Sequence, residues 1–574
     1  MRRIRSLVLV VAVSAALSPA VSAHAGDAFT LYGSGWGHGL GLSQWGAYGL
    51  ASEGWTSKQI LTHFYSGTKV AEMSDPPGDV RIALTSGETA IHLTAAAGPV
   101  RLSIDHQVGG KLVGKIPDGQ TWVVKVVDGA YEIHDAAGDV VGGTTWGSES
   151  SDLFASYADH GARVTVPEGG ATYSRGFLEF NLMACTGGCS LRLILQVPFE
   201  QYLLGIGEVP SSWPMEALRA QATAARSFAL YKIRTYGVQA TCNCHLTDGS
   251  NDQVYIGWDM EGGPDGKRWV KAVRSTAGQI VTYKGAVALT VFTASDGGHT
   301  EDLNVQWGTP LSTYPYLAGV CDPGDYTAAN PWTDWNRQFS ANALTTALLA
   351  YTGDIGSVSG FGAVHRGVSG RIADAVVHGA NGDATVTGSE LRSALSLPDD
   401  RVWVNADKNV LGDIRTKYDS LMCEPGQPTS TTKTLPGGSR QVFQTGAIYR
   451  NATVEATVWL KGPVYDEYIA AGGALGKLGL PIADPINMTK LPGATCPLGC
   501  SRVDFERGRI YWKGGIGAFA LSGDVLAFYL DHDGASGPLG FPTSGVQQAD
   551  NGAASATFEH GTITCPSGGT CRTS

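Results

Sequence analysis

A strong helix signal runs from Met215 to Tyr236, where neither glycine nor proline occurs. Alanine, leucine, arginine and methionine, which favour helices, are frequent in this stretch. Small and apolar residues recur three and four positions apart, so one narrow face can pack closely against other elements. Pro214 suits a first helical turn, and Ser212 would cap the helix if it begins at Trp213. We expect a long helix here, with the rest of the domain packed around it.

One carboxylate, Glu208, lies in the expected turn ahead of this helix, close in sequence to Val209, Pro210 and Trp213. Apolar neighbours would raise its pKa by desolvation, whereas a helix N-terminus would lower it. A carboxyl group balanced between these effects can donate a proton near neutral pH. From chemistry alone, a solvated glutamate in a turn remains the alternative.

The segments on both sides of Glu208 resemble the stage II sporulation protein D and amidase-enhancer family (SpoIID/LytB domain) of cell-wall proteins. The resemblance is carried by VPFEQYLLG at 197–205, EVP at 208–210, AQA at 220–222 and AARS at 224–227. It implies that Glu208 is the catalytic acid of a lytic transglycosylase, with Val209 in place of the methionine of the family. It further implies that Arg226, on the following helix, holds Glu208 in place or stabilises charge.

A glycine-rich block near the N-terminus, GWGHGLGLSQWGA at 35–47, resembles the GHG-x-G-x-SQ motif of the same family. A helix broken at Gly54 is expected to follow, over residues 47–65. The resemblance implies that His38, Ser43 and Gln44 bind substrate in the groove of Glu208. The block often ends the domain in the family but comes first here, so the two blocks must meet in space. A structural role for His38 in a tight glycine loop is the alternative.

A third family-like segment, SDGGHTE, spans residues 295–301. Ser295 and His299 lie four apart in an expected turn without a nucleophile elbow, so we reject a serine hydrolase pair. We expect both side chains to bind sugar, together with Gln253 and Tyr255 from the segment after the long helix.

The order of these segments predicts an α+β fold, in which a catalytic core of mixed sheet and helices carries a β-rich insertion and precedes a repeat module. Alternating apolar residues between turn signals indicate the β-rich insertion. The expected parts are a signal peptide (1–25), the GHG block of the core (26–74), the insertion (75–170), the remaining core (171–423), a linker (424–440) and the repeat module (441–574).

Internal repeats identify the last part of the chain. The stretch VYDEYIAAGGALGKLGLP at 464–481 aligns without gaps on VLAFYLDHDGASGPLGFP at 525–542, and an F-x-x-G-x-I phrase occurs three times. This pattern resembles the LGFP repeat of actinobacterial exported proteins. The resemblance implies a stacked module that anchors the enzyme to cell-wall polysaccharide, and not a second active site.

The N-terminus has the pattern of a signal peptide: three arginines, a short apolar run and a small-residue cleavage site within residues 1–25. We therefore expect a secreted, wall-associated protein. A formal net charge of −11 makes nucleic acid a poor candidate partner.

Ten cysteines fit an oxidising compartment. We expect disulfides within three close pairs, Cys185/Cys189, Cys496/Cys500 and Cys565/Cys571, and a long loop closed by Cys321 and Cys423. Cys242, Cys244 and His245 could instead supply three zinc ligands, but a zinc site wants four, so we favour a disulfide there and expect no cofactor.

Two functional hypotheses remain open on the sequence. The first is a lytic transglycosylase that cleaves MurNAc–GlcNAc glycan strands of peptidoglycan with one Glu as acid and base. The second is a non-catalytic wall-binding protein, or an enhancer of a separate amidase.

Overall fold

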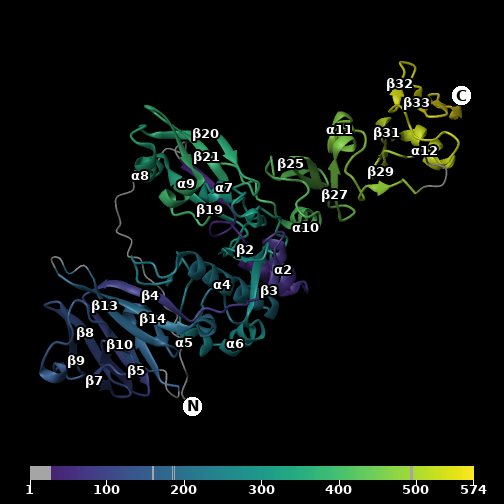
Figure 1. Cartoon of the computed structure of the whole chain (residues 1–574). Helices are drawn as coiled ribbons and strands as arrows, with labels where there is room; N and C mark the ends of the chain where they lie inside the picture. Colours follow the sequence, from purple (N-terminus) through teal and green to yellow (C-terminus); the bar gives the residue numbers. More distant parts are fainter. Residues whose placement is uncertain (1–27, 158–160, 184, 186–187, 491–495) are drawn as a thin grey trace, which may run out of the picture.

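The computed structural model describes residues 28–157, 161–183, 185, 188–490 and 496–574. The expected signal peptide lies outside them. Within these ranges, no helix is long and apolar enough to cross a membrane. Helices and several separate sheets alternate along the described chain, which confirms the α+β class (Figure 1).

Helix α4 (Met215–Tyr236) forms the centre of the core. Its alanine-rich faces are buried, and α1 (Gln44–Ser52), α2 (Ser57–Phe64), α6 (Gly266–Ser275) and β16 (Gln279–Tyr283) all contact it. Small side chains allow this close approach from several sides. The sequence therefore predicted the long helix and the break between α1 and α2 correctly.

The start of α4 differs from the expectation. The helix begins at Met215, after Pro214, and no side chain caps it. A cap by Ser212 is therefore wrong, because Ser212 would cap only a helix that begins at Trp213.

The other short elements of the core are β2 (Leu42–Ser43), β3 (Lys69–Glu72), α3 (Phe199–Tyr202), η3 (Leu203–Gly205), β15 (Leu246–Thr247), α5 (Trp258–Glu261), β17 (Ala286–Val287), β18 (Phe292–Thr293), α7 (Leu303–Trp307) and η4 (Pro315–Leu317).

A two-sheet β-body lies beside this core (Figure 1). Its seven-stranded sheet has the order β15-β4-β14-β13-β10-β6-β7, and its five-stranded sheet the order β12-β11-β5-β8-β9. The bounds are β4 (Asp79–Glu88), β5 (Ala90–Ala97), β6 (Val100–Ile104), β7 (Lys111–Ile116), β8 (Thr121–Val127), β9 (Ala130–His134), η1 (Val141–Gly143), β10 (Leu153–Ser156), β11 (Arg163–Val166), η2 (Pro167–Gly169), β12 (Ala171–Tyr173), β13 (Phe177–Met183) and β14 (Ser190–Pro198). Because β4 pairs with β14, which leads directly to the Glu208 turn, the β-rich insertion shares its larger sheet with the core.

A third body is built from segments that are far apart in the sequence. Strand β1 (Ala28–Gly33) pairs with both β19 (Trp335–Ser340) and β23 (Val402–Val404). Strand β19 is set by this pairing with β1, and helix α8 (Ala341–Thr352) follows it. The remaining elements are β20 (Val358–Arg366), β21 (Ile372–Gly379), β22 (Gly382–Thr387), α9 (Gly388–Leu395) and α10 (Gly412–Ser420).

Three four-stranded sheets make up the repeat module, which extends away from the core (Figure 1). Their elements are β24 (Lys433–Leu435), β25 (Gly438–Phe443), β26 (Gly446–Asn451), β27 (Ala456–Lys461), α11 (Gly462–Ala470), η5 (Gly473–Leu475), β28 (Ile486–Asn487), β29 (Cys500–Phe505), β30 (Gly508–Lys513), β31 (Gly517–Ser522), α12 (Gly523–Asp531), η6 (Gly534–Ser536), β32 (Gln547–Gln548), β33 (Ala554–Phe558), β34 (Gly561–Cys565) and β35 (Arg572–Thr573). Strand β24 and the start of β25 fall inside the stretch expected to be a linker, so the first repeat begins earlier than the composition suggested.

Candidate functional site

Glu208 lies in the turn between η3 and α4, on the wall of a pocket of about 410 Å³. The turn is held by the segment at 254–255: Gly207 N–H donates to the Val254 carbonyl at 2.9 Å, and Val254 N–H donates to Glu208 Oε1 at 2.7 Å. Ser212 and Asp259 line the same pocket. The carboxyl group is therefore fixed by backbone and faces a cavity large enough for part of a sugar.

Burial raises the pKa of Glu208 to about 7, and the negative charge of Asp248 adds to this effect. The Val254 N–H and the Gln44 side chain donate hydrogen bonds to the carboxyl group and oppose the rise. Burial wins over these donors, as the apolar neighbours in the sequence suggested. A carboxyl group with this pKa is half protonated near neutral pH and can both donate and accept a proton.

The contact between Gln44 and Glu208 brings the N-terminal glycine-rich block to the candidate site. Gln44 is the first residue of α1, and Ser43 caps that helix by accepting a hydrogen bond from Gly46 N–H at 3.0 Å. A Cβ at Gly46 would lie 1.8 Å from Asp322 Oδ2, so only glycine fits where α1 passes that carboxylate. The expectation that the two family-like blocks meet in space agrees with this geometry.

Arg226 contacts Glu200 and does not hold Glu208 directly, while the alternative that it stabilises charge stays a prediction. Its guanidinium is fully buried and makes a paired contact with Glu200, Nε to Oε1 at 2.8 Å and Nη2 to Oε2 at 3.0 Å. The side chain also donates to the Gln279 and Val273 carbonyls. Arg226 and Glu200 therefore join α4 to α3, to α6 and to the start of β16.

Four expected substrate-binding side chains lie inside the protein, and this expectation is also wrong for them. Gln253 accepts from the Tyr202 hydroxyl at 2.8 Å and donates to the Ala225 carbonyl, while Tyr255 stacks on Tyr202. The hydroxyls of Ser43 and Ser295 both donate to Asp325. Each of the four is at most 3 % exposed, which leaves no surface for a glycan strand.

The two expected histidines are held by local contacts. The His38 ring accepts from Leu40 N–H at 3.0 Å and packs on Trp307, and burial lowers its pKa to about 4. His299 Nδ1 lies 2.6 Å from the Thr300 carbonyl, and burial likewise lowers its pKa to about 4. Both imidazoles are therefore neutral at physiological pH. This favours the structural alternative for His38, whereas sugar binding by His299 stays a prediction.

All ten cysteines form disulfides in the pairs that the sequence favoured, Cys185–Cys189, Cys242–Cys244, Cys321–Cys423, Cys496–Cys500 and Cys565–Cys571. The disulfide between Cys242 and Cys244 removes both thiolates from any metal site. His245 Nδ1 accepts from Arg81 N–H at 3.0 Å.

Three groups around Glu208 lie outside the motifs of the sequence: Val254 N–H, Asp248 and Asp259. Asp248 accepts from Tyr255 N–H at 2.8 Å, which places its charge near Glu208. Asp248 and Val254 belong to the loop that folds back onto the turn, and Asp259 lies in α5.

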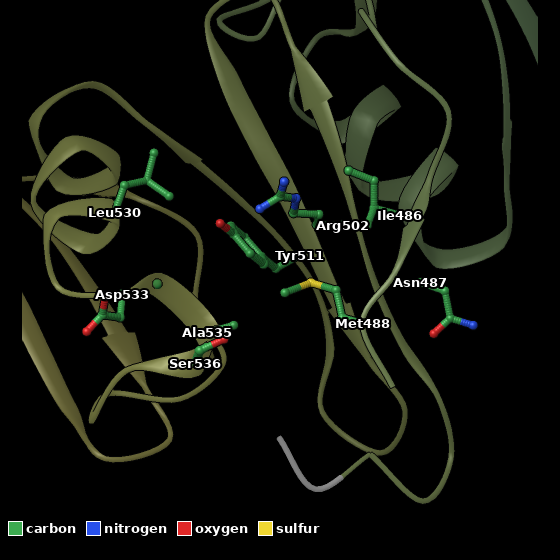
Figure 2. A pocket seen from close by; sticks show the side chains of 10 residues that line it. Ile486, Asn487, Met488, Arg502, Tyr511, Leu530, Asp533, Ala535 and Ser536 are labelled. Carbon is green, nitrogen blue, oxygen red and sulfur yellow. The ribbon is translucent and has the colours of Figure 1, made fainter. Parts of the chain in front are cut away.

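A second hollow, of about 300 Å³, lies in the repeat module (Figure 2). Figure 2 shows Arg502, Tyr511 and Met488 on one side of it, and Leu530 and Ser536 on the other. Arg502 and Tyr511 face each other across strands β29 and β30, and Arg440 and Tyr449 do the same in the preceding sheet. The arginine–tyrosine pair is therefore a repeated feature of the module.

Comparison with known proteins gives two family matches. Residues 188–283 match the family model described as stage II sporulation protein, and residues 426–476 match that of the LGFP repeat.

Similar curated proteins include an uncharacterised protein of Brachyspira hyodysenteriae, 33 % identical over 28 % of this chain and 41 % of its own length. The amidase enhancer of Bacillus subtilis is 33 % identical over 25 % of this chain and 17 % of its own length. Stage II sporulation protein D of Bacillus subtilis is 28 % identical over 35 % of this chain and 58 % of its own length. The chain thus spans less than two thirds of each of these relatives. This chain therefore contains one segment that matches the stage II sporulation protein family model and, after it, one segment that matches the LGFP repeat.

Proposed function

We propose that this protein is a secreted, wall-associated lytic transglycosylase that cleaves the MurNAc–GlcNAc bond in peptidoglycan glycan strands. The observation that carries the proposal is a single glutamate, Glu208, with a pKa of about 7 on the wall of a pocket. Its position in the family-like EVP segment and the similarity to stage II sporulation protein D support the same assignment.

In the proposed reaction, protonated Glu208 donates its proton to the glycosidic oxygen, and the bond from that oxygen to muramic C1 breaks. The resulting carboxylate takes the proton of the muramic C6 hydroxyl, and the C6 oxygen bonds to C1. The products are a 1,6-anhydromuramic end and a free GlcNAc hydroxyl, with Glu208 protonated again. This chemistry requires one carboxyl group and no water.

Val254 N–H and Gln44 stabilise the carboxylate that forms between the two steps. Hydrolytic glycosidases usually need a second carboxyl group as nucleophile or base. Asp259 lines the same pocket and is the residue that would serve hydrolysis. The chemical nature of the new chain ends therefore separates transglycosylation from hydrolysis.

The second candidate function is enhancement of a separate amidase. It is favoured by the similarity to a protein named amidase enhancer. A non-catalytic enhancer would bind wall material and change no glycan bond by itself.

The decisive experiment is digestion of purified, peptide-free glycan strands by the wild type and by Glu208→Gln. We expect anhydromuramic ends from the wild type and none from the variant, because glutamine keeps the size of the side chain but cannot supply the proton. The Asp259→Asn variant should still release anhydromuramic ends. Glu216→Gln is the matched control, since Glu216 pairs with Arg219 outside the pocket.

A wild-type protein that cleaves no glycan but stimulates an added amidase would favour the enhancer function instead. Reducing ends without anhydro groups would indicate hydrolysis.

For the repeat module, we propose binding to cell-wall polysaccharide, on the strength of the LGFP match and of the hollow in Figure 2. A tyrosine beside an arginine suits a sugar ring, because the aromatic face can pack on it while the guanidinium donates to its hydroxyls. Arg502→Ala should weaken sedimentation with purified walls and leave glycan cleavage unchanged.

A further inference from the structure

Three aspartates from two loops meet inside the core. The ligating oxygens of Asp296, Asp322 and Asp325 lie within 4.8 Å of one another, and each residue is at most 1 % exposed. Asp296 belongs to the SDGGHTE segment, and the other two follow Cys321, which the disulfide to Cys423 fixes. Three carboxylates this close and this deeply buried are costly unless protons or a cation compensate their charge.

The hydrogen-bond donors around the cluster satisfy only part of it. Asp325 accepts from the hydroxyls of Ser43 and Ser295 at 3.0 and 2.9 Å. Asp296 Oδ1 accepts from Gly298 N–H, and Asp322 Oδ1 accepts from Gly324 N–H. Among the described residues, no donor reaches Oδ2 of either Asp296 or Asp322, and both of these oxygens are buried. Ser43 also lies close to Asp322, but its single proton is already given to Asp325.

The nearby guanidinium groups do not neutralise the cluster. Arg371 contacts Asp399 at 2.7 Å and Asp400 at 3.5 Å, and Arg415 contacts Asp419 at 2.8 Å. Each arginine thus already has its own carboxylate partner. Burial, and after it the negative charge of the neighbouring aspartates, holds the pKa values of Asp296 and Asp322 well above their usual range.

We propose that Asp296, Asp322 and Asp325 form a buried site for a divalent cation that prefers oxygen ligands, with Ca²⁺ as its ion. Ca²⁺ binds oxygens at about 2.3–2.6 Å, so two of its ligands can be up to about 5 Å apart. The two unpartnered Oδ2 atoms supply free lone pairs, and Asp325 supplies a third carboxylate.

The site would act on the candidate catalytic centre through α1. Ser43 bonds to Asp325 and caps α1, and Gln44, the next residue, bonds to Glu208. An ion that fixes Asp325 therefore fixes the helix turn from which Gln44 reaches the carboxyl group. This is a positioning role, and the ion itself does not contact the pocket residues named above.

The test uses the full secreted chain, freed of metal with EDTA and transferred to chelator-treated buffer. Saturating Ca²⁺ should raise Tm by about 4 °C or more, and titration calorimetry should give one ion per chain. Mg²⁺, measured in parallel, should give a smaller shift. A response to Mg²⁺ but not to Ca²⁺ would overturn the choice of ion.

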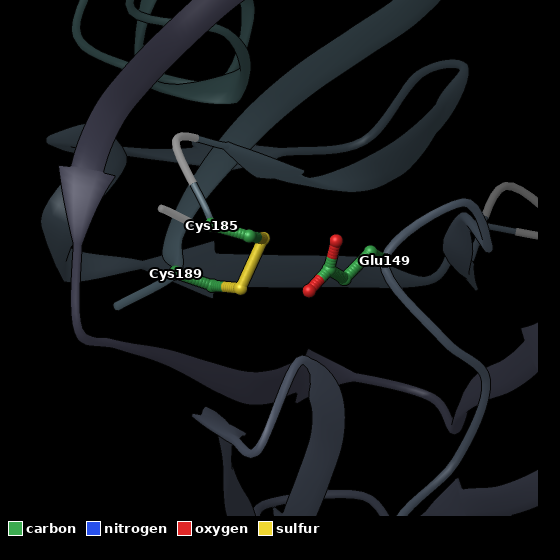
Figure 3. Close-up of side chains that lie close together, drawn as sticks. All are labelled: Glu149, Cys185 and Cys189. Carbon is green, nitrogen blue, oxygen red and sulfur yellow. A yellow bond between two sulfur atoms is a disulfide. The ribbon is translucent and has the colours of Figure 1, made fainter. Parts of the chain in front are cut away.

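Asp296→Asn and Asp322→Asn should each abolish the Ca²⁺ response while keeping the shape of the side chain. Glu149→Gln is the matched control. Glu149 lies beside Cys185 and Cys189 (Figure 3), a grouping that cannot offer thiolates because the two sulfurs are bonded. The Glu149→Gln variant should therefore keep the full rise in Tm with Ca²⁺.

Wild-type protein whose Tm is unchanged by Ca²⁺, Mg²⁺ and EDTA would overturn the proposal, and would indicate that the aspartates share protons. A Ca²⁺ response that persists in both aspartate variants would place the ion elsewhere and would overturn it equally. Because the readout is stability, the result does not depend on whether Glu208 is catalytic.

Discussion

At the scale of single residues, the environment of Glu208 distinguishes it from the other glutamates of the core. Glu200 is paired with Arg226, and Glu216 with Arg219, so an adjacent cation stabilises each of those carboxylates. Glu208 instead has only neutral donors, Val254 N–H and Gln44, together with a carboxylate neighbour in Asp248. Glu208 is therefore the one of these three without a cationic partner, and burial raises its pKa to about 7.

The raised pKa of Glu208 predicts that, as pH rises, cleavage declines while Glu208→Gln gains stability relative to the wild type. The group titrates at about 7 in the folded protein and near 4.5 when unfolded, so the folded state binds more protons between these values. The contribution of Glu208 to stability is therefore greatest below pH 4.5 and falls, by up to about 3 kcal/mol, as pH rises to 7. Cleavage should also decline above pH 7, where the acid is lost.

Glu208→Gln removes this titration. Thermal unfolding should show the variant gaining stability relative to the wild type between pH 5 and pH 8. Glu216→Gln should show no such gain. Parallel pH profiles for Glu208→Gln and the wild type would contradict the raised pKa.

Gln44 offers a second test at the same scale. Gln44→Met removes a donor that stabilises the Glu208 carboxylate, so the pKa of Glu208 should rise. The alkaline limb of the activity profile should move to higher pH. Gln338→Met, at an exposed position of β19, is the control and should leave the limb in place. An unshifted limb in Gln44→Met would show that this hydrogen bond does not act on the acid.

At the scale of elements, the Arg226–Glu200 pair connects α4 to α3 and thereby supports the turn that carries Glu208. Arg226 is fully buried, whereas the Glu200 side chain is 39 % exposed. Glu200→Gln leaves the guanidinium without its counter-charge and should lower the free energy of unfolding by about 1–3 kcal/mol. Chemical denaturation measures this loss, and cleavage per folded molecule should stay close to that of the wild type. A loss of cleavage without a loss of stability would instead make Glu200 a candidate for the catalytic acid.

The sequence was sufficient for elements whose signal is local. The residues from Met215 to Tyr236 contain no helix breaker, and the glycines of the GHG block indicated the close approach now seen at Gly46. The sequence was insufficient to predict the contacts of the polar residues inside the motifs. Ser295 is satisfied by Asp325, thirty positions away, and Gln253 by Tyr202, fifty-one positions away. Whether a motif side chain faces substrate or core depends on such distant partners, and their spacing leaves no local pattern.

At the scale of the whole molecule, each repeat completes the core of its neighbour. Residues of α11 and its sheet pack with Val503, Phe505 and Ile510 of the next sheet. The first repeat in turn packs on the preceding core, where Ile414 and Tyr418 of α10 contact buried residues of β25–β27. The repeat module is therefore continuous with the core and not suspended from it by a free linker.

This continuity changes what removal of the repeats should do. A chain that ends at Cys423 keeps the Cys321–Cys423 disulfide but exposes Ile414 and Tyr418, which pack on Phe443 and Trp459 in the full chain. Burial of one such side chain contributes about 1.5–3 kcal/mol, so the shortened chain should melt several degrees lower than the full chain. It should also lose sedimentation with purified walls while still cleaving peptide-free glycan. Undiminished wall binding would contradict the anchoring role of the repeats. An unchanged Tm would show that the contact between α10 and the first repeat contributes no stability. The repeat module would then be independent of the core in stability.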